Sequence, residues 1–113
     1  MRSIALLSGF VALCLSLASV PAAALTPDQL KTSTEQQRYA ALKGDKTEQA
    51  NYLITRDYVY KAHDVVTGKL KPDKMPDEPD EYESKYLLPG DALTLRTAIK
   101  LALTAYIDSQ RTA

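Results

Sequence analysis

Few side chains in this 113-residue chain could support catalysis, and only one of them is a histidine, His63. Asp57 and Tyr60 are the candidate catalytic partners of His63 on the same predicted helix, but no Ser or Cys nucleophile accompanies them. The four glycines do not form a phosphate-binding loop. We therefore expect His63 to be an ordinary surface residue, in a protein that is not an enzyme and has no catalytic residue, cofactor or metal ligand.

A second group of side chains with chemical potential is the run of carboxylates in KPDKMPDEPDEYESKYLLPGD, residues 71–91. Carboxylate oxygens suit a hard cation such as Ca²⁺. The segment nevertheless lacks the central glycine and the terminal bidentate glutamate of an EF-hand loop. Pro72, Pro76 and Pro79 also favour extended conformations, which carry successive carboxylates apart. We expect residues 68–90 to be an acidic, proline-rich connector.

Three interpretations of this connector remain open. The favoured one is a solvated tether between two helices, on the basis of the usual lengths of such connectors. The second is a docking arm anchored by Tyr82, Tyr86, Leu87 and Leu88, in which EYESKYLL forms a short helix that folds back over the core. Specific cation binding is the weakest of the three, because the loop geometry for it is missing.

The N-terminus has the layout of a secretory signal peptide. Arg2 precedes an uncharged apolar run, Ile4–Val20, and small residues in an A-x-A pattern end at Ala24. We expect residues 1–24 to be removed, which would place the protein in the periplasm or outside the cell. The alternative is a leader that stays uncleaved and anchors the chain in a membrane, since the apolar run is just long enough to reach across a bilayer core.

Residues 25–113 form one small domain with nearly balanced charge. Arg2 is the only charged residue before them, which leaves 13 Lys plus Arg against 14 Asp plus Glu and a formal net charge of −1. We therefore expect no nucleic-acid partner, and membrane contact only if the leader stays uncleaved. Cys14, the only cysteine, would leave with the leader, so disulfides and thiol chemistry would be excluded.

The hydrophobic pattern predicts three helices and no strand. The first should cover about residues 26–43, with capping-box spacings that begin at Thr26 and at Thr34. The second should begin after Asp45 as N-cap and end at Gly68. The third should follow Asp91, and its narrow polar stripe suggests a central position. The expected fold is all-α: a small bundle of three helices, or of four if the connector adds one, with the long connector before the last helix.

A stripe on the second predicted helix is our candidate for protein binding. Leu53 and Tyr60 are seven residues apart, and Arg56 lies between them on a face that is otherwise charged. Tyr and Arg often dominate the energetics of protein interfaces. We predict that Leu53, Arg56 and Tyr60, together with Tyr82 and Tyr86 of the connector, bind a partner. The alternative is that the first helix or the 82–88 segment covers this stripe within the fold.

The sequence as a whole favours a small exported helical protein that acts by protein–protein binding. Its partner would be another exported protein, and its role that of an accessory subunit in a larger periplasmic or envelope complex. Two alternatives stay open. One is a periplasmic inhibitor or immunity protein directed against a toxin or hydrolase. The other is a binder of a small ligand that uses the seven tyrosines.

Overall fold

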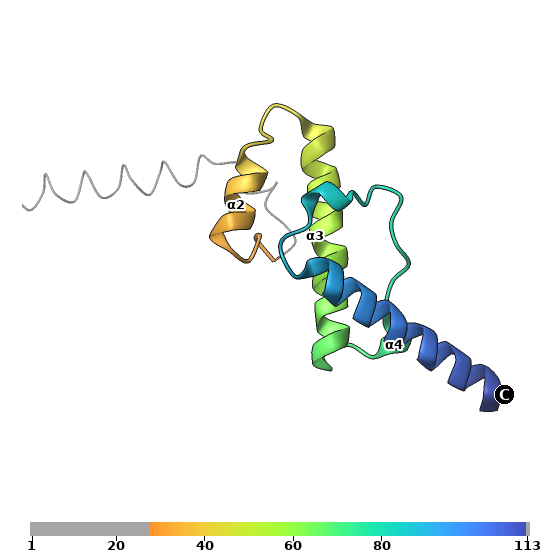
Figure 1. The fold of residues 1–113 in the computed structure, drawn as a ribbon. Coiled ribbons are helices and arrows are strands. Elements are labelled where there is room, and N and C mark those ends of the chain that lie inside the picture. The colour runs from red at the N-terminus through yellow and green to blue at the C-terminus, as the bar shows by residue number, and fades with distance from the viewer. Residues whose placement is uncertain (1–27, 113) are drawn as a thin grey trace, which may run out of the picture.

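The computed structural model describes residues 28–112 and is all-helical, as expected (Figure 1). The expected signal peptide at residues 1–24 lies outside the described residues. Within them the chain forms no strand. Three α-helices and two single 3₁₀ turns make up the structure: α2 (Ser33–Ala40), α3 (Lys46–Thr67), η2 (Pro72–Lys74), η3 (Ser84–Tyr86) and α4 (Asp91–Thr112).

The boundaries of α3 confirm the caps expected from the sequence. The side chain of Asp45 accepts a hydrogen bond from the backbone N–H of Glu48 at 3.0 Å, which satisfies one of the free donors at the helix start. The helix ends at Gly68, whose φ of 86° lies in the left-handed region that glycine adopts without strain. The cap N–H of Gly68 then bonds back to carbonyls of the last turn.

The first helix is shorter than expected and begins later. The prediction of a start near Thr26 is wrong for the described part, because Asp28, Gln29 and Leu30 all have positive φ and form a left-handed turn. The capping box closes at Thr32 rather than at Thr34. Thr32 and Glu35 exchange side-chain and backbone hydrogen bonds, both at 3.1 Å, and α2 runs from there for two turns only.

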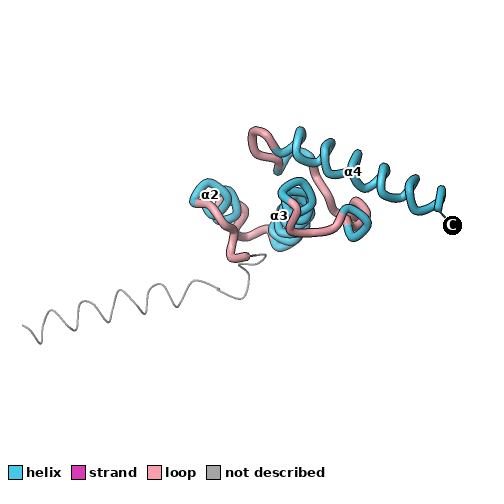
Figure 2. Tube along the Cα trace, turned by 90° about the horizontal axis from the view of Figure 1, so that it is seen from below, coloured by secondary structure: helices cyan, strands magenta, loops and turns pink. Residues whose placement is uncertain are grey.

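The central element is α3 rather than the last helix. Viewed along α3, α2 and α4 lie on different sides of it (Figure 2). Helix α4 crosses α3 with its first half, where Leu95 and Ala98 are buried, and its second half projects away from the other helices (Figure 1). The three helices therefore do not lie side by side along their lengths, and the packing is more open than the expected bundle.

The core consists of two clusters on either side of α3. One joins α3 to the start of α4, with residues of the connector packed against it: Tyr58, Val59, Ala62, Val65, Leu95 and Ala98, flanked by Leu70, Met75, Tyr82 and Leu87. The other joins α3 to α2 and η3, and it is built largely of tyrosine: Leu30, Tyr39, Tyr52 and Tyr86. In both clusters the tyrosine rings meet edge to face, the geometry that aromatic pairs prefer.

The second half of the connector is fastened to α3. The backbone N–H of Glu83 donates to the hydroxyl of buried Thr55 at 3.0 Å, and Asn51 donates to the Glu83 carboxylate at 2.8 Å. Lys85 lies 3.2 Å from carboxylate oxygens of both Glu48 and Glu83. The short helix expected in EYESKYLL is a single 3₁₀ turn, η3. These contacts determine where the chain enters α4.

Candidate functional site

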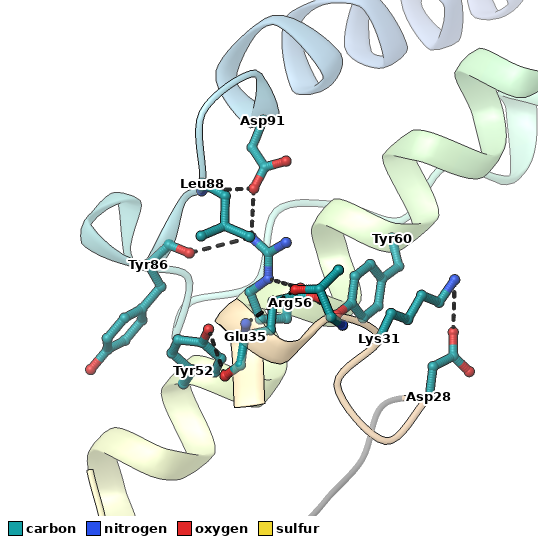
Figure 3. A network of polar contacts seen from close by, with 10 residues as sticks. Asp28, Lys31, Glu35, Tyr52, Arg56, Tyr60, Tyr86, Leu88 and Asp91 are labelled. Carbon is teal, nitrogen blue, oxygen red and sulfur yellow. Dashed lines mark hydrogen bonds and ion pairs between the residues drawn. The ribbon is translucent and has the colours of Figure 1, made fainter. Parts of the chain in front are cut away.

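A buried arginine joins the three α-helices. Arg56 of α3 is only 3% exposed, and its guanidinium lies between Glu35 of α2 and Asp91 at the start of α4 (Figure 3). Its Nε is 2.6 Å from Glu35 Oε2, and its Nη1 is 2.6 Å from Asp91 Oδ2. Glu35 is 1% exposed and Asp91 17% exposed, so most of this network is removed from water. A single cation therefore holds one carboxylate from each of two flanking helices.

Further hydrogen bonds satisfy the buried charges. Glu35 accepts from the hydroxyl of Tyr60 through Oε2 and from the N–H of Thr32 through Oε1. Asp91 Oδ2 accepts from the N–H of Leu88 at 2.8 Å. Arg56 Nη1 also donates to the carbonyl of Tyr86 at 3.3 Å. A buried ion pair is tolerated when its remaining donors and acceptors are filled in this way.

The network raises the pKa values of both Arg56 and Tyr60. Burial alone would lower the pKa of Arg56, but the hydrogen bonds that it donates to Asp91 and Glu35, together with the negative charges of these carboxylates, outweigh burial and raise the pKa. Burial raises the pKa of Tyr60 far above its ordinary value, and the hydrogen bond to Glu35 raises it further. The guanidinium thus stays charged and the phenol neutral. Neither group is poised to exchange a proton near neutral pH.

The structure engages the five predicted partner-binding residues within the fold. Arg56 and Tyr60 belong to the network, and Tyr86 is buried in the tyrosine cluster. Leu53 is half-buried against that same cluster, and Tyr82 is half-buried beside Tyr58. Helix α2 and the 82–88 segment cover the stripe of Leu53, Arg56 and Tyr60 within the monomer, as the alternative interpretation of the sequence expected. These residues are thus mostly covered in the monomer, and their binding of a partner stays a prediction.

Sequence reasoning missed the two carboxylates that meet Arg56. Asp91 was expected only as a helix cap, and Glu35 was not singled out. One signal in the sequence could have indicated them. The segment that forms α2 has only one large apolar side chain, Tyr39, although the helix packs on α3. A helix with so little to bury can be held by a charged pair instead.

A hollow beside the network is lined by both positively and negatively charged residues. It holds about 330 Å³ and reaches the floor formed by Glu35, Arg56 and Asp91. Its remaining charged lining is Lys31, Lys69 and Asp64, with His63 exposed at the rim. Positive and negative groups nearly cancel, and the buried ones already have partners. In the described part of the chain, His, Asp and Glu residues form no group that could hold a metal ion.

The second half of α4 holds most of the large apolar residues that are exposed in the described part of the chain. Ile99, Leu103, Tyr106 and Ile107 follow the i, i+4, i+7, i+8 spacing of one helix face. Their exposed fractions are 49%, 56%, 61% and 45%. Isolated exposed apolar residues are common on proteins, whereas a contiguous apolar stripe of this kind needs an explanation. We call these four residues the α4 stripe.

A groove runs along one edge of the α4 stripe. It holds about 370 Å³ and lies between α4 and the connector. Tyr58, Met75, Ile99, Ala102 and Leu103 give it an apolar floor, and the exposed carboxylates of Asp77 and Glu78 form its rim. The groove is therefore apolar inside and negative along the connector side.

Comparison with known proteins does not assign the chain to a family. No protein-family model matches it, and neither the curated proteins nor the solved structures yield a significant match. None of the helices within residues 28–112 combines the length and the apolar character needed to span a bilayer. Function therefore has to be inferred from the geometry itself.

Proposed function

We propose that this protein is a small exported helical protein that acts by protein–protein binding, with the α4 stripe as its docking surface. Its role is that of an accessory subunit in a larger periplasmic or envelope complex, and its chemistry is binding rather than catalysis. The observation that carries the proposal is the exposure of four large apolar side chains along one face of a helix that projects from the body (Figure 1).

The exposure of this stripe is not explained by the needs of the monomer. The network around Arg56 shows that the fold buries charged groups to hold its helices together. A domain so short of apolar contacts would gain stability by covering Leu103 and Tyr106. Their position beyond the body of the fold is instead what a helix-mediated interface uses, in which large apolar and aromatic side chains supply most of the binding energy.

The tyrosine-based ligand site has less support than protein binding. Five of the seven tyrosines are buried, and three edge-to-face pairs account for most of them. Tyr106 is exposed, but it lines neither the hollow beside the network nor the groove beside α4. An inhibitory or immunity role would use the same stripe as an accessory role, so the identity of the captured partner separates those two.

Site-specific photo-crosslinking in the native host tests this proposal. A photoreactive residue in place of Leu103 should crosslink to another exported protein. The matched control is the same residue in place of Leu93, which is 62% exposed but does not belong to the α4 stripe. Capture from position 103 and not from position 93 supports an accessory subunit, and capture of a foreign toxin or hydrolase would support the inhibitor. If position 103 yields no crosslink to any protein, the proposal is wrong.

Export is tested separately by the mass of the mature protein. The proposed signal peptide implies a chain that begins at Leu25 and is recovered from the periplasm or the medium. Recovery of the intact chain in the membrane fraction would instead support the anchored alternative.

A further inference from the structure

The groove beside the α4 stripe is bordered by two carboxylates. Asp77 and Glu78 form its connector side, and both are exposed. Within residues 28–112 neither carboxylate forms an ion pair, and no lysine, arginine or histidine lines the groove. Both negative charges are therefore available to a ligand that carries positive charge.

The floor of the groove adds a hydroxyl without a partner. Tyr58 is 5% exposed and lines the groove, and its ring packs edge to face on Tyr82 with 5.6 Å between the ring centroids. Among the described residues the Tyr58 hydroxyl finds no hydrogen-bond partner, although it keeps some access to solvent. A tyrosine hydroxyl in so buried a side chain normally has a partner. This one is available to a group that enters the groove.

The carboxylates on the rim act on this hydroxyl. Burial raises the pKa of Tyr58, and negative charge at Glu78, Tyr82 and Asp77 raises it further. The phenol is therefore neutral near neutral pH, and its oxygen can accept a hydrogen bond, as both carboxylates can. A ligand that uses all three groups has to be a hydrogen-bond donor with positive charge.

The rest of the groove is apolar, which narrows the kind of cation that fits. Met75 of the connector and Ile99, Ala102 and Leu103 of α4 line it. Lysine and arginine have long aliphatic stems that lie along apolar surface while the charged end reaches a polar group. A metal ion fits less well, because in the described part of the chain the carboxylates form no group that could hold one.

We infer that this groove binds a lysine or arginine side chain of the protein that docks on the α4 stripe. The inference rests on the proposed function, because Ile99 and Leu103 belong to both the stripe and the groove. Ala102 lies one turn after buried Ala98, so the groove follows the border between the buried face of α4 and the stripe. A protein that covers the stripe reaches the groove with its next side chain. Its docking segment therefore has apolar residues for the stripe and a basic residue beside them.

Methyl NMR on the purified exported protein tests the groove without a partner. The basic probes are acetyl-arginine methylamide and acetyl-lysine methylamide. Acetyl-citrulline methylamide is the control, because it keeps the shape of the arginine probe without its charge. A basic probe should shift the methyl signals of Met75, Ile99 and Leu103, with a dissociation constant on the order of millimolar, because an exposed ion pair contributes little. The inference is wrong if neither basic probe shifts these signals, or if the citrulline probe binds as well as the arginine probe.

Substitutions in the groove identify the groups that bind the probes. Asp77→Asn with Glu78→Gln removes the charge of the rim and should weaken binding on the order of fivefold. Asp80→Asn with Glu81→Gln is the matched control, because it removes the same charge from exposed positions of the connector that do not line the groove. Tyr58→Phe removes only the hydroxyl, so it should weaken binding while the melting temperature is kept. If both groove variants bind the basic probes as the parent does, the inference fails.

Photo-crosslinking in the native host connects the groove to the partner. With a photoreactive residue in place of Leu103, Asp77→Asn with Glu78→Gln should lower the yield of the captured protein, whereas Asp80→Asn with Glu81→Gln should not. Full yield in both backgrounds would show that the partner does not use the groove and would overturn the inference. Capture from position 103 without probe binding would defeat this inference and leave the proposed function standing. Probe binding without any capture would refute the proposed function, and with it the partner assigned to the groove.

Discussion

Removal of the buried cation should be the most damaging single change to the fold. In Arg56→Met, Glu35 keeps its burial but loses its counter-charge, and only the Tyr60 hydroxyl and the Thr32 N–H still donate to it. Removal of one partner from a buried ion pair typically costs about 3–5 kcal/mol, because the other charge is left in a poorly solvated place. We expect Arg56→Met to fall in that range.

The expected loss of stability for the other substitutions in the network follows from how exposed each carboxylate is. Glu35→Gln keeps the shape and an acceptor for Thr32, and Arg56 keeps Asp91 as its counterion, so we expect a smaller cost of about 2 kcal/mol. Asp91→Asn should cost about 1 kcal/mol, because Asp91 is 17% exposed and water can replace part of what is lost. Arg56→Lys should lie between these extremes, since an ammonium group cannot bridge two carboxylates with a planar fork.

Urea denaturation followed by circular dichroism at 222 nm measures these free energies of unfolding. A double-mutant cycle is decisive: Glu35→Met combined with Arg56→Met removes both buried charges and should be more stable than Arg56→Met alone. An Arg56→Met variant that stays within about 1 kcal/mol of the parent would refute the account of the network. So would strictly additive effects of Glu35 and Arg56, because a direct ion pair must couple them.

Three other predictions concern the cap, the phenols and the connector. Gly68→Ala should destabilise the protein by about 1 kcal/mol in the same urea assay, because φ is 86° there although nothing crowds the added methyl group. Burial and the hydrogen bond to Glu35 raise the pKa of Tyr60 in the folded protein, so above about pH 10 the unfolded chain releases a proton that the folded protein keeps. The free energy of unfolding should therefore be constant below about pH 10 and fall above it. Denaturation from pH 8 to 11 should show a shallower fall in Tyr60→Phe, and an equal slope would contradict this assignment. Thr55→Val should leave the N–H of Glu83 without its acceptor at a cost of about 1–3 kcal/mol, with faster amide exchange at residue 83 as the specific sign.

Signals from neighbouring residues were enough to predict the ends of α3, but not which elements pack against it. An Asp three residues before a Glu and a glycine after the last apolar turn defined both ends of this helix, because caps depend on neighbours in sequence. The buried face was also largely predictable from periodicity, with Tyr52, Tyr58, Ala62 and Val65 on it.

The charged face of α3 was misleading because burial of a charge depends on distant residues. Glu35 is 21 residues before Arg56 and Asp91 is 35 residues after it. No local pattern indicates that those carboxylates will return to one guanidinium. The same holds for the connector, in which Thr55 accepts from a backbone N–H that lies 28 residues further along the chain. The sequence could show that Tyr60 was out of place on a polar face, but not which element would cover it.

The fold buries charged groups and leaves large apolar groups exposed, and this contrast supports a binding role for the α4 stripe. The fold joins α2 to α3 through a buried ion pair, an arrangement that well-packed hydrophobic residues could often replace without loss of stability. At the same time it leaves Leu103 and Tyr106 on a projecting helix with more than half of each residue exposed. An isolated helical segment of about twelve residues is marginal in water unless an apolar face is covered. The projecting half of α4 is continuous with the buried first half of the helix, and a protein that covers the α4 stripe would stabilise it further.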